Sequence, residues 1–275
     1  MMTIREQAFA GKPLDTFTID CHTHLTQYFK SGWHQNPKFW SLESLIEVYD
    51  SLGVDCCVTA PHAIIDSMTV EANEVAEEAA KLFPGRIYGY ISVAPFEGLD
   101  VLKSNLKRFA SNPAFVGMKF LGGYNGDYTD PIYRYATDFA EEARCPILCH
   151  SWGNMPSHDT LRDMALTHPN MKLICAHQGG GNAALTDSIA KVVAECPNLY
   201  VETCGSLYNQ YGIEDIVRLC GEDRVVFGTD AINLDARFDF GRVALAPLED
   251  EVMAKVLSGN FLNLLETSQM GKIKV

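Results

Sequence analysis

Short apolar runs and longer amphipathic stretches alternate along the whole chain. Eight runs of five to eight residues are rich in β-branched, aromatic and other apolar side chains, as expected for buried strands. In chain order these runs are Thr16–Cys21, Val54–Ala60, Arg86–Val93, Phe115–Leu121, Cys145–His150, Lys172–His177, Leu199–Thr203 and Arg224–Gly228. The pattern therefore predicts eight strands.

Segments with helical spacing lie between the runs. Between residues 42 and 52, for example, apolar side chains recur three and four positions apart, which predicts one buried helix face. The predicted helices are Leu42–Leu52, Thr69–Phe83, Leu99–Ala110, Pro131–Ala143, Ser157–Thr167, Ala183–Glu195, Gly212–Cys220, Glu249–Leu257 and Ser258–Glu266. Such strand–helix alternation favours parallel strands joined by right-handed helical crossovers.

Eight strand–helix units in a chain of 275 residues indicate an α/β fold of the (β/α)8 TIM-barrel type. An open doubly wound sheet shows the same alternation. However, the chain has no Gly-x-Gly-x-x-Gly fingerprint and no Walker-type loop to support a nucleotide-binding sheet. It also has no linker or low-complexity tract, so we expect residues 1–275 to form a single domain.

Composition narrows the classes of partner. The formal net charge is −13 and no basic stripe is present, which argues against nucleic acid and anionic membranes. No apolar run reaches the roughly 20 residues that span a bilayer. The nine cysteines are odd in number and form no Cys-x-x-Cys pair, so we expect a reducing cytoplasm. A small-molecule substrate is the expected partner, and a homo-oligomer stays possible.

Candidate metal ligands lie at the ends of predicted strands. They are His22, His24, His150, His177 and Asp230. The carboxyl ends of the strands form a single rim in a closed barrel, so these side chains are expected to converge. Imidazole and carboxylate groups bind divalent metals such as Zn²⁺. A site of this composition is therefore predicted at the barrel mouth.

These motifs resemble the amidohydrolase superfamily, in particular the amidohydrolase-2 branch that includes the aminocarboxymuconate-semialdehyde decarboxylase group. The resemblance covers nearly the whole chain. The segments that carry it are Ile19–His24, Gly117–Lys119, Cys149–His150, Ala176–Gly180, Phe227–Asp230 and Leu257–Leu264.

The resemblance implies that His22, His24, His150 and Asp230 bind the metal. Asp230 is also the implied general base, and His177 is the implied catalytic group that polarises the substrate. The implied cofactor is a divalent metal, with Zn²⁺ as our prediction and one ion favoured over two. An alternative is a carbamylated Lys119 that bridges two ions, with His150 and His177 on the second ion.

Five residues are predicted to contact the substrate. They are Lys119, Tyr124, Trp152, Asn154 and Arg237, in the fourth strand or in segments that follow strands. Aromatic walls with a few fixed polar groups are typical of small-molecule pockets.

Three functions fit these residues. The main prediction is hydrolysis of an amide, lactone or ester-like bond by a metal-activated water. The alternative is metal-dependent, non-hydrolytic decarboxylation of an unsaturated or aromatic carboxylate, because fold alone does not fix the reaction. The third is a non-catalytic binding barrel, although Asp230 and the additional histidine exceed what simple binding requires.

Overall fold

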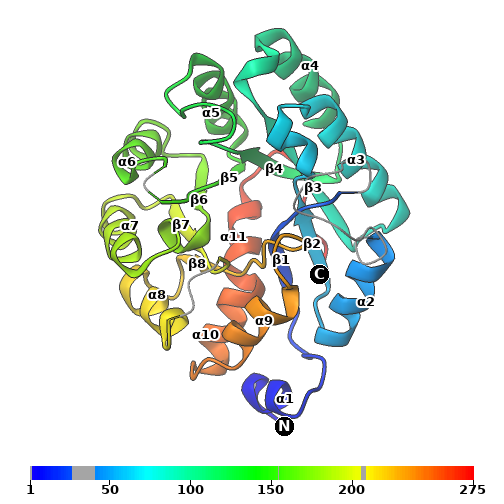
Figure 1. The fold of residues 1–275 in the computed structure, drawn as a ribbon, viewed down its shortest axis with the longest axis vertical. Helices are drawn as coiled ribbons and strands as arrows, with labels where there is room; N and C mark the ends of the chain where they lie inside the picture. The colour runs from blue at the N-terminus through cyan, green and yellow to red at the C-terminus, as the bar shows by residue number, and fades with distance from the viewer. Residues whose placement is uncertain (1, 27–40, 154, 206–208) are drawn as a thin grey trace.

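The computed structural model describes residues 2–26, 41–153, 155–205 and 209–275 of the chain. Its eight strands form one parallel sheet in sequence order, ringed by helices (Figure 1). The strands are β1 (Ile19–Thr23), β2 (Cys56–Thr59), β3 (Ile87–Val93), β4 (Phe115–Phe120), β5 (Pro146–Cys149), β6 (Lys172–Cys175), β7 (Leu199–Glu202) and β8 (Val225–Val226). The predicted (β/α)8 TIM barrel is confirmed.

The first and last strands meet along a seam of backbone hydrogen bonds. The Cys21 N–H donates to the Phe227 carbonyl over 3.0 Å, and the Asp230 N–H donates to the His22 carbonyl over 2.8 Å. These bonds close the sheet into a barrel, although β8 itself is only two residues long.

A buried carboxylate on β1 reinforces this seam. Asp20 accepts hydrogen bonds from the Thr229 N–H (3.0 Å) and hydroxyl (2.5 Å), and from the Tyr49 hydroxyl (2.6 Å). Burial raises the pKa of Asp20 to about 7, while these hydrogen bonds act in the opposite direction. Asp20 therefore ties β1 to the segment after β8 and to the helix that follows β1.

The helices of the described residues mostly follow the predicted positions. They are α1 (Ile4–Phe9), α2 (Leu42–Leu52), α3 (Thr69–Leu82), α4 (Leu99–Phe109), α5 (Pro131–Ala143), α6 (His158–Thr167), α7 (Ala183–Glu195), α8 (Gly212–Cys220), α9 (Ala236–Ala244), α10 (Asp250–Ala254) and α11 (Asn260–Glu266). A π-helical segment, Lys255–Gly259, joins the last two. The sequence pattern did not predict α1 and α9, which begin at side-chain caps from Thr3 and Asp235. No helix in these ranges is long and apolar enough to cross a bilayer.

The core has two apolar layers, one on each side of the ring of strands. The outer layer packs strand residues such as Ile147 against the helices, and the inner layer fills the barrel with residues such as Val58 and Leu148. Phe261 of α11 joins this inner layer. The tail beyond α11 bonds to the start of β4, where the Gly271 N–H donates to the Phe115 carbonyl over 2.9 Å. The C-terminal segment thus covers the amino end of the barrel, while the strands carry the candidate ligands at their carboxyl ends.

Candidate metal centre and active site

A register shift in β1 brings both histidines of the His-x-His motif to the barrel mouth. Between its pairings at Asp20 and Thr23, β1 advances three residues while β2 advances two. A bulge of this kind re-aims side chains beside an active site. His22 and His24 are both buried and lie together, with ring centroids 5.2 Å apart.

Asp230 brings a carboxylate to these two imidazoles from beyond β8. Its Oδ1 lies 3.0 Å from Nε2 of His24 and 3.8 Å from Nε2 of His22. Its φ of 56° is a left-handed conformation, which costs energy for a non-glycine residue and is common at functional sites. Burial acts to raise the pKa of Asp230, but the adjacent imidazoles of His24, His22 and His177 bring it well below its usual range. We call His22, His24 and Asp230 the front cluster.

Hydrogen bonds at the Nδ1 atoms of the two histidines decide which ring nitrogens of the front cluster carry hydrogen. His24 Nδ1 lies 2.6 Å from the Ala60 carbonyl, which can only accept, so Nδ1 carries the hydrogen. The Nε2 lone pair of a neutral His24 then faces the Asp230 carboxylate. His22 is arranged in the same way, because its Nδ1 lies 3.2 Å from a Glu202 carboxylate oxygen. Two lone pairs and an anionic oxygen that converge on one point form a binding place for a cation.

A divalent metal fits this binding place. The ligand atoms of the front cluster all lie within 4.8 Å of one another, and all three residues are buried. Burial lowers the pKa of His22 well below its usual range, so the imidazole is neutral and available as a ligand. The outer hydrogen bonds to Ala60 and Glu202 fix both rings in the required orientation.

Lys119 reaches the front cluster because of a second bulge, in β4. Between Phe115 and Gly117, β4 advances two residues while β3 advances one. Met118 consequently packs in the outer core, and Lys119 lies fully buried with its Nζ 2.8 Å from Nε2 of His22. Burial lowers the pKa of this amine. The structure therefore brings the predicted substrate-binding lysine to the predicted metal ligands.

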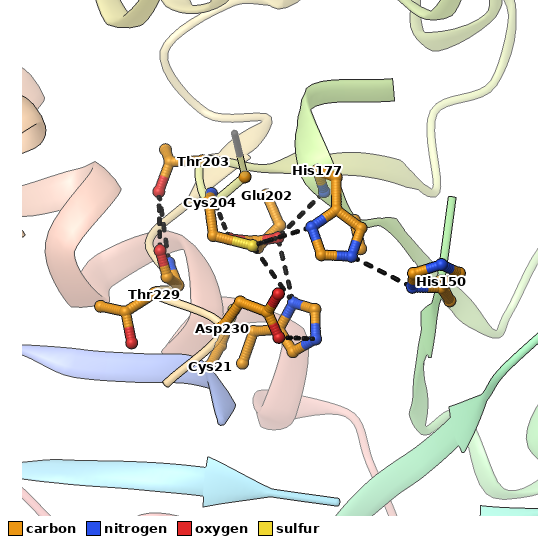
Figure 2. Close-up of polar contacts among 12 residues, drawn as sticks. Cys21, His150, His177, Glu202, Thr203, Cys204, Thr229 and Asp230 are labelled. Atoms are coloured by element: carbon orange, nitrogen blue, oxygen red, sulfur yellow. Dashed lines mark hydrogen bonds and ion pairs between the residues drawn. The ribbon is translucent and has the colours of Figure 1, made fainter. Parts of the chain in front are cut away.

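A second group of side chains lies on the Nδ1 side of His22. We call His177, Glu202 and Cys204 the rear cluster. The Cys204 Sγ lies 3.2 Å from Nδ1 of His177 and donates to Oε2 of Glu202 over 2.9 Å. Figure 2 shows the Cys204 sulfur next to the Glu202 carboxylate and joined by a dashed line to the His177 ring. The predicted catalytic His177 therefore belongs to the site, where burial lowers its pKa to about 4.

His150 lies beyond His177 rather than in the front cluster. Its Nδ1 is 3.1 Å from Nε2 of His177, and burial lowers its pKa well below the usual range (Figure 2). Among the described residues, neither group whose ligand atoms lie within 4.8 Å of one another includes His150. β5 ends at Cys149, so His150 is the first residue outside the strand and meets the neighbouring histidine. The structure thus gathers three of the four predicted metal ligands.

Two predicted aromatic residues reach the edge of the site. The Trp152 ring lies 5.7 Å from the His177 ring and is 47% exposed. The Tyr124 ring lies 5.5 Å from the His150 ring and is 48% exposed. Both rings stand edge-on to an imidazole of the site and are half-exposed, as a substrate-binding wall requires.

The other two predicted substrate contacts have different outcomes. Arg237 does not join the clusters, because its side chain is 66% exposed and forms an ion pair of 2.6 Å with Asp235 at the start of α9. The Asp235 cap therefore holds this guanidinium at the surface. Asn154 lies outside the described residues.

Sequence comparison identifies the family. A model of the amidohydrolase family matches residues 19–265, which include every strand and both clusters. The chain belongs to the amidohydrolase family. A search of curated proteins finds no match.

Several solved structures have the same fold as this amidohydrolase. The structure of 5-carboxyvanillate decarboxylase from Novosphingobium aromaticivorans DSM 12444, complexed with manganese, has a TM-score of 0.74 at 14% identity, and covers 97% of this chain and 100% of its own. The 2,6-dihydroxybenzoate decarboxylase from Rhizobium has a TM-score of 0.70 at 16% identity, with 93% and 99% covered. A dihydroxybenzoic acid decarboxylase from Polaromonas sp. JS666, with bound manganese and 2-nitroresorcinol, gives 0.70 at 16%, with 91% and 97% covered.

Three residues of this amidohydrolase site were not among the predicted site residues. Glu202 and Cys204 are two positions apart at the end of β7, the same spacing as the two histidines at the end of β1. His62 is buried and stacks on His24, with ring centroids 4.9 Å apart. Alternation at a strand end was the available signal for Glu202 and Cys204.

Proposed function

We propose that this amidohydrolase-family protein is a metal-dependent decarboxylase of a small aromatic or unsaturated carboxylic acid. The observation that carries the proposal is the Lys119 amine, fixed 2.8 Å from Nε2 of a metal-ligand histidine. A metal ion and an ammonium group side by side form a binding place for a carboxylate. Hydrolysis of a neutral amide or ester has no need for this second cation.

The walls of the site support an aromatic or otherwise planar substrate. Trp152 and Tyr124 are half-exposed and lie next to His177 and His150. Offset or edge-on contact with such rings stabilises another planar ring. The structures with the same fold are named for decarboxylation of dihydroxybenzoate and carboxyvanillate, which favours this reaction over the hydrolysis we first predicted from the sequence.

The residues divide the reaction between them. His22, His24 and Asp230 would hold the ion, which when bound supplies positive charge to bind and polarise a substrate oxygen. Lys119 pairs with the substrate carboxylate. Loss of CO₂ breaks a C–C bond and leaves the electron pair on the substrate carbon, which must take up one proton. We assign to His177 the transfer of that proton from solvent to the substrate carbon, because its ring lies between His22 (5.1 Å) and Trp152 (5.7 Å).

The donor set suits more than one metal. Two imidazole nitrogens and a carboxylate oxygen bind Zn²⁺ well, and they also accept Mn²⁺, the metal in two of the similar structures. We keep Zn²⁺ as the prediction from the donors. Metal analysis of protein purified without chelators, followed by reloading with each ion, tests it directly.

Isotope labelling separates the two reactions. The reloaded protein would be assayed for CO₂ release with hydroxybenzoates and unsaturated carboxylates, in D₂O and in H₂¹⁸O, with Asp230→Asn as the inactive control. We expect CO₂ together with one deuterium on the carbon that lost it. Incorporation of ¹⁸O into a cleaved amide, lactone or ester, without CO₂, would establish hydrolysis instead.

We also propose that the protein acts in a reducing compartment, the cytoplasm. All nine cysteines are buried free thiols. Cys204 is part of the rear cluster, so its thiol form matters for the arrangement around Glu202. Loss of activity under oxidising conditions, reversed by dithiothreitol, would support this proposal.

A further inference from the structure

Glu202 lies behind the front cluster as a fully buried carboxylate that the proposed reaction does not use. Its side chain is 0% exposed. Oε2 accepts from His22 Nδ1 (3.2 Å), from the His177 N–H (3.1 Å) and from the Cys204 thiol (2.9 Å), and Oε1 accepts from the Cys204 N–H. A buried charge is tolerated only when it is hydrogen-bonded in this way.

These bonds have a direct effect on a metal ligand. A carboxylate can only accept, so the hydrogen of a neutral His22 is held on Nδ1. The Nε2 lone pair is consequently turned toward Asp230 and the point where the ion would lie. The same carboxylate holds the backbone of His177, so it sets a metal ligand and the proposed proton donor together.

Gly228 at the end of β8 provides the room for this contact. A Cβ at this position would lie 2.5 Å from Oε1 of Glu202 and 2.8 Å from Cβ of His22. The backbone of Gly228 is not among the left-handed glycines, so the demand for glycine is one of space. Three strands are therefore shaped to place the carboxylate against the back of His22.

We propose that Glu202 is a positioning residue for His22 and His177, and that Cys204 assists by donating its thiol hydrogen to Glu202. The inference rests on the metal-binding part of the proposed function and is independent of the reaction. Glu202 acts through His22, and loss of such an outer partner typically lowers metal affinity about 10- to 100-fold.

The test compares metal affinity among variants of the full-length protein. Metal-free protein would be titrated with Zn²⁺ and Mn²⁺ in competition with a chelator. We expect Glu202→Gln to weaken binding about 10- to 100-fold. Glu97→Gln is the matched control, because this partly buried carboxylate accepts from the Thr69 N–H (2.8 Å) and hydroxyl away from the clusters. Its affinity should equal that of the wild type.

Cys204 offers a finer comparison with little change in volume. Cys204→Ser keeps a donor to Glu202, whereas Cys204→Val removes it. We expect the serine variant to bind metal more tightly than the valine variant. Equal affinities would remove Cys204 from the proposal.

A spectroscopic measurement distinguishes loss of the His22 orientation from unfolding of a variant. Ring ¹⁵N shifts of His22 in the metal-free wild type should show a hydrogen on Nδ1, and Glu202→Gln should move part of the population to the other tautomer. Unchanged affinity and tautomer in a folded Glu202→Gln protein would overturn the inference.

Two further outcomes are distinguishable from that one. A wild type that binds no divalent metal would overturn the proposed function itself. A wild type that binds two ions, one of them lost in Cys204→Ser, would show that the rear cluster is a metal site and would overturn the positioning role.

Discussion

The two sides of the His22 ring differ in whether their polar atoms are satisfied. On the Nε2 side, His24 and Asp230 approach with a lone pair and an anionic oxygen. On the Nδ1 side, Glu202 accepts from a thiol, an imidazole and two backbone N–H groups. Lone pairs and an anionic oxygen therefore gather on the Nε2 side, beside the Lys119 Nζ at 2.8 Å from Nε2, whereas hydrogen bonds already occupy both Glu202 oxygens on the Nδ1 side.

This difference separates binding groups from orienting groups. Both clusters contain histidine and a carboxylate, so composition alone does not distinguish them. The direction of each hydrogen bond does, because a proton held on one ring nitrogen decides what the other nitrogen can bind. Variants on the two sides should consequently have different effects.

The largest effect is expected in the front cluster. Asp230→Ala and His22→Ala remove a metal ligand, so metal affinity should fall by more than the roughly 100-fold limit for an outer partner, and turnover should be lost. Metal content by mass spectrometry and CO₂ release measure both. A fully loaded Asp230→Ala protein would contradict the front cluster as the metal site.

The next effect is expected at His177. His177→Gln should lower kcat about 10²- to 10⁴-fold, the usual contribution of a general acid or base, while metal content stays near that of the wild type. His150→Ala belongs to the same experiment and should also keep its metal. Metal loss in the His150 variant would restore the ligand set predicted from the sequence.

The pH dependence of stability should show the burial of His177. Its pKa is about 4 in the folded protein and about 6.5 when unfolded, so between these values the unfolded chain binds more protons. Stability is therefore complete above pH 6.5 and falls as pH decreases toward 4, by about 3 kcal/mol for this group. Urea unfolding of metal-free protein should show a shallower pH dependence in His177→Gln than in the wild type.

A smaller effect is expected at the aromatic edge. Trp152→Leu removes a ring contact worth about 0.5–1.5 kcal/mol, so KM should rise roughly 2- to 12-fold with little change in kcat. Steady-state kinetics measure this. A large loss of kcat would indicate that Trp152 also holds His177 in place.

The smallest effect is expected at Arg237. Arg237→Ala removes an exposed ion pair with Asp235, which contributes about 0–1 kcal/mol to stability, and KM should stay unchanged. A KM increase of tenfold or more would show that this guanidinium reaches the substrate. The sequence-based assignment would then stand.

The sequence predicted the site residues whose positions follow from strand periodicity and barrel geometry. His22, His24, His177 and Asp230 lie at or just beyond the carboxyl ends of strands, and the closed fold brings them to one mouth. The orientation of Lys119 depends on a bulge that arises from pairing between β3 and β4, and no local pattern marks it.

The remaining differences also come from contacts between distant segments. Glu202 was not among the predicted site residues, because its partners beyond its own strand are contributed by two other strand ends, at His22 and His177. Arg237 was placed near the substrate because it follows the eighth strand, yet the Asp235 cap begins an unpredicted helix and holds it outside. His150 was expected beside His22 and instead meets its neighbour on the next strand end.

The front cluster crosses the seam between the first and last strands. His22 and His24 come from residues near the start of the chain, and Asp230 comes more than 200 positions later. A nascent chain that has emerged only as far as β7 holds both imidazoles without their counter-charge. An ion gripped by all three ligands fastens the two ends of the polypeptide together, so its binding free energy adds to that of barrel closure.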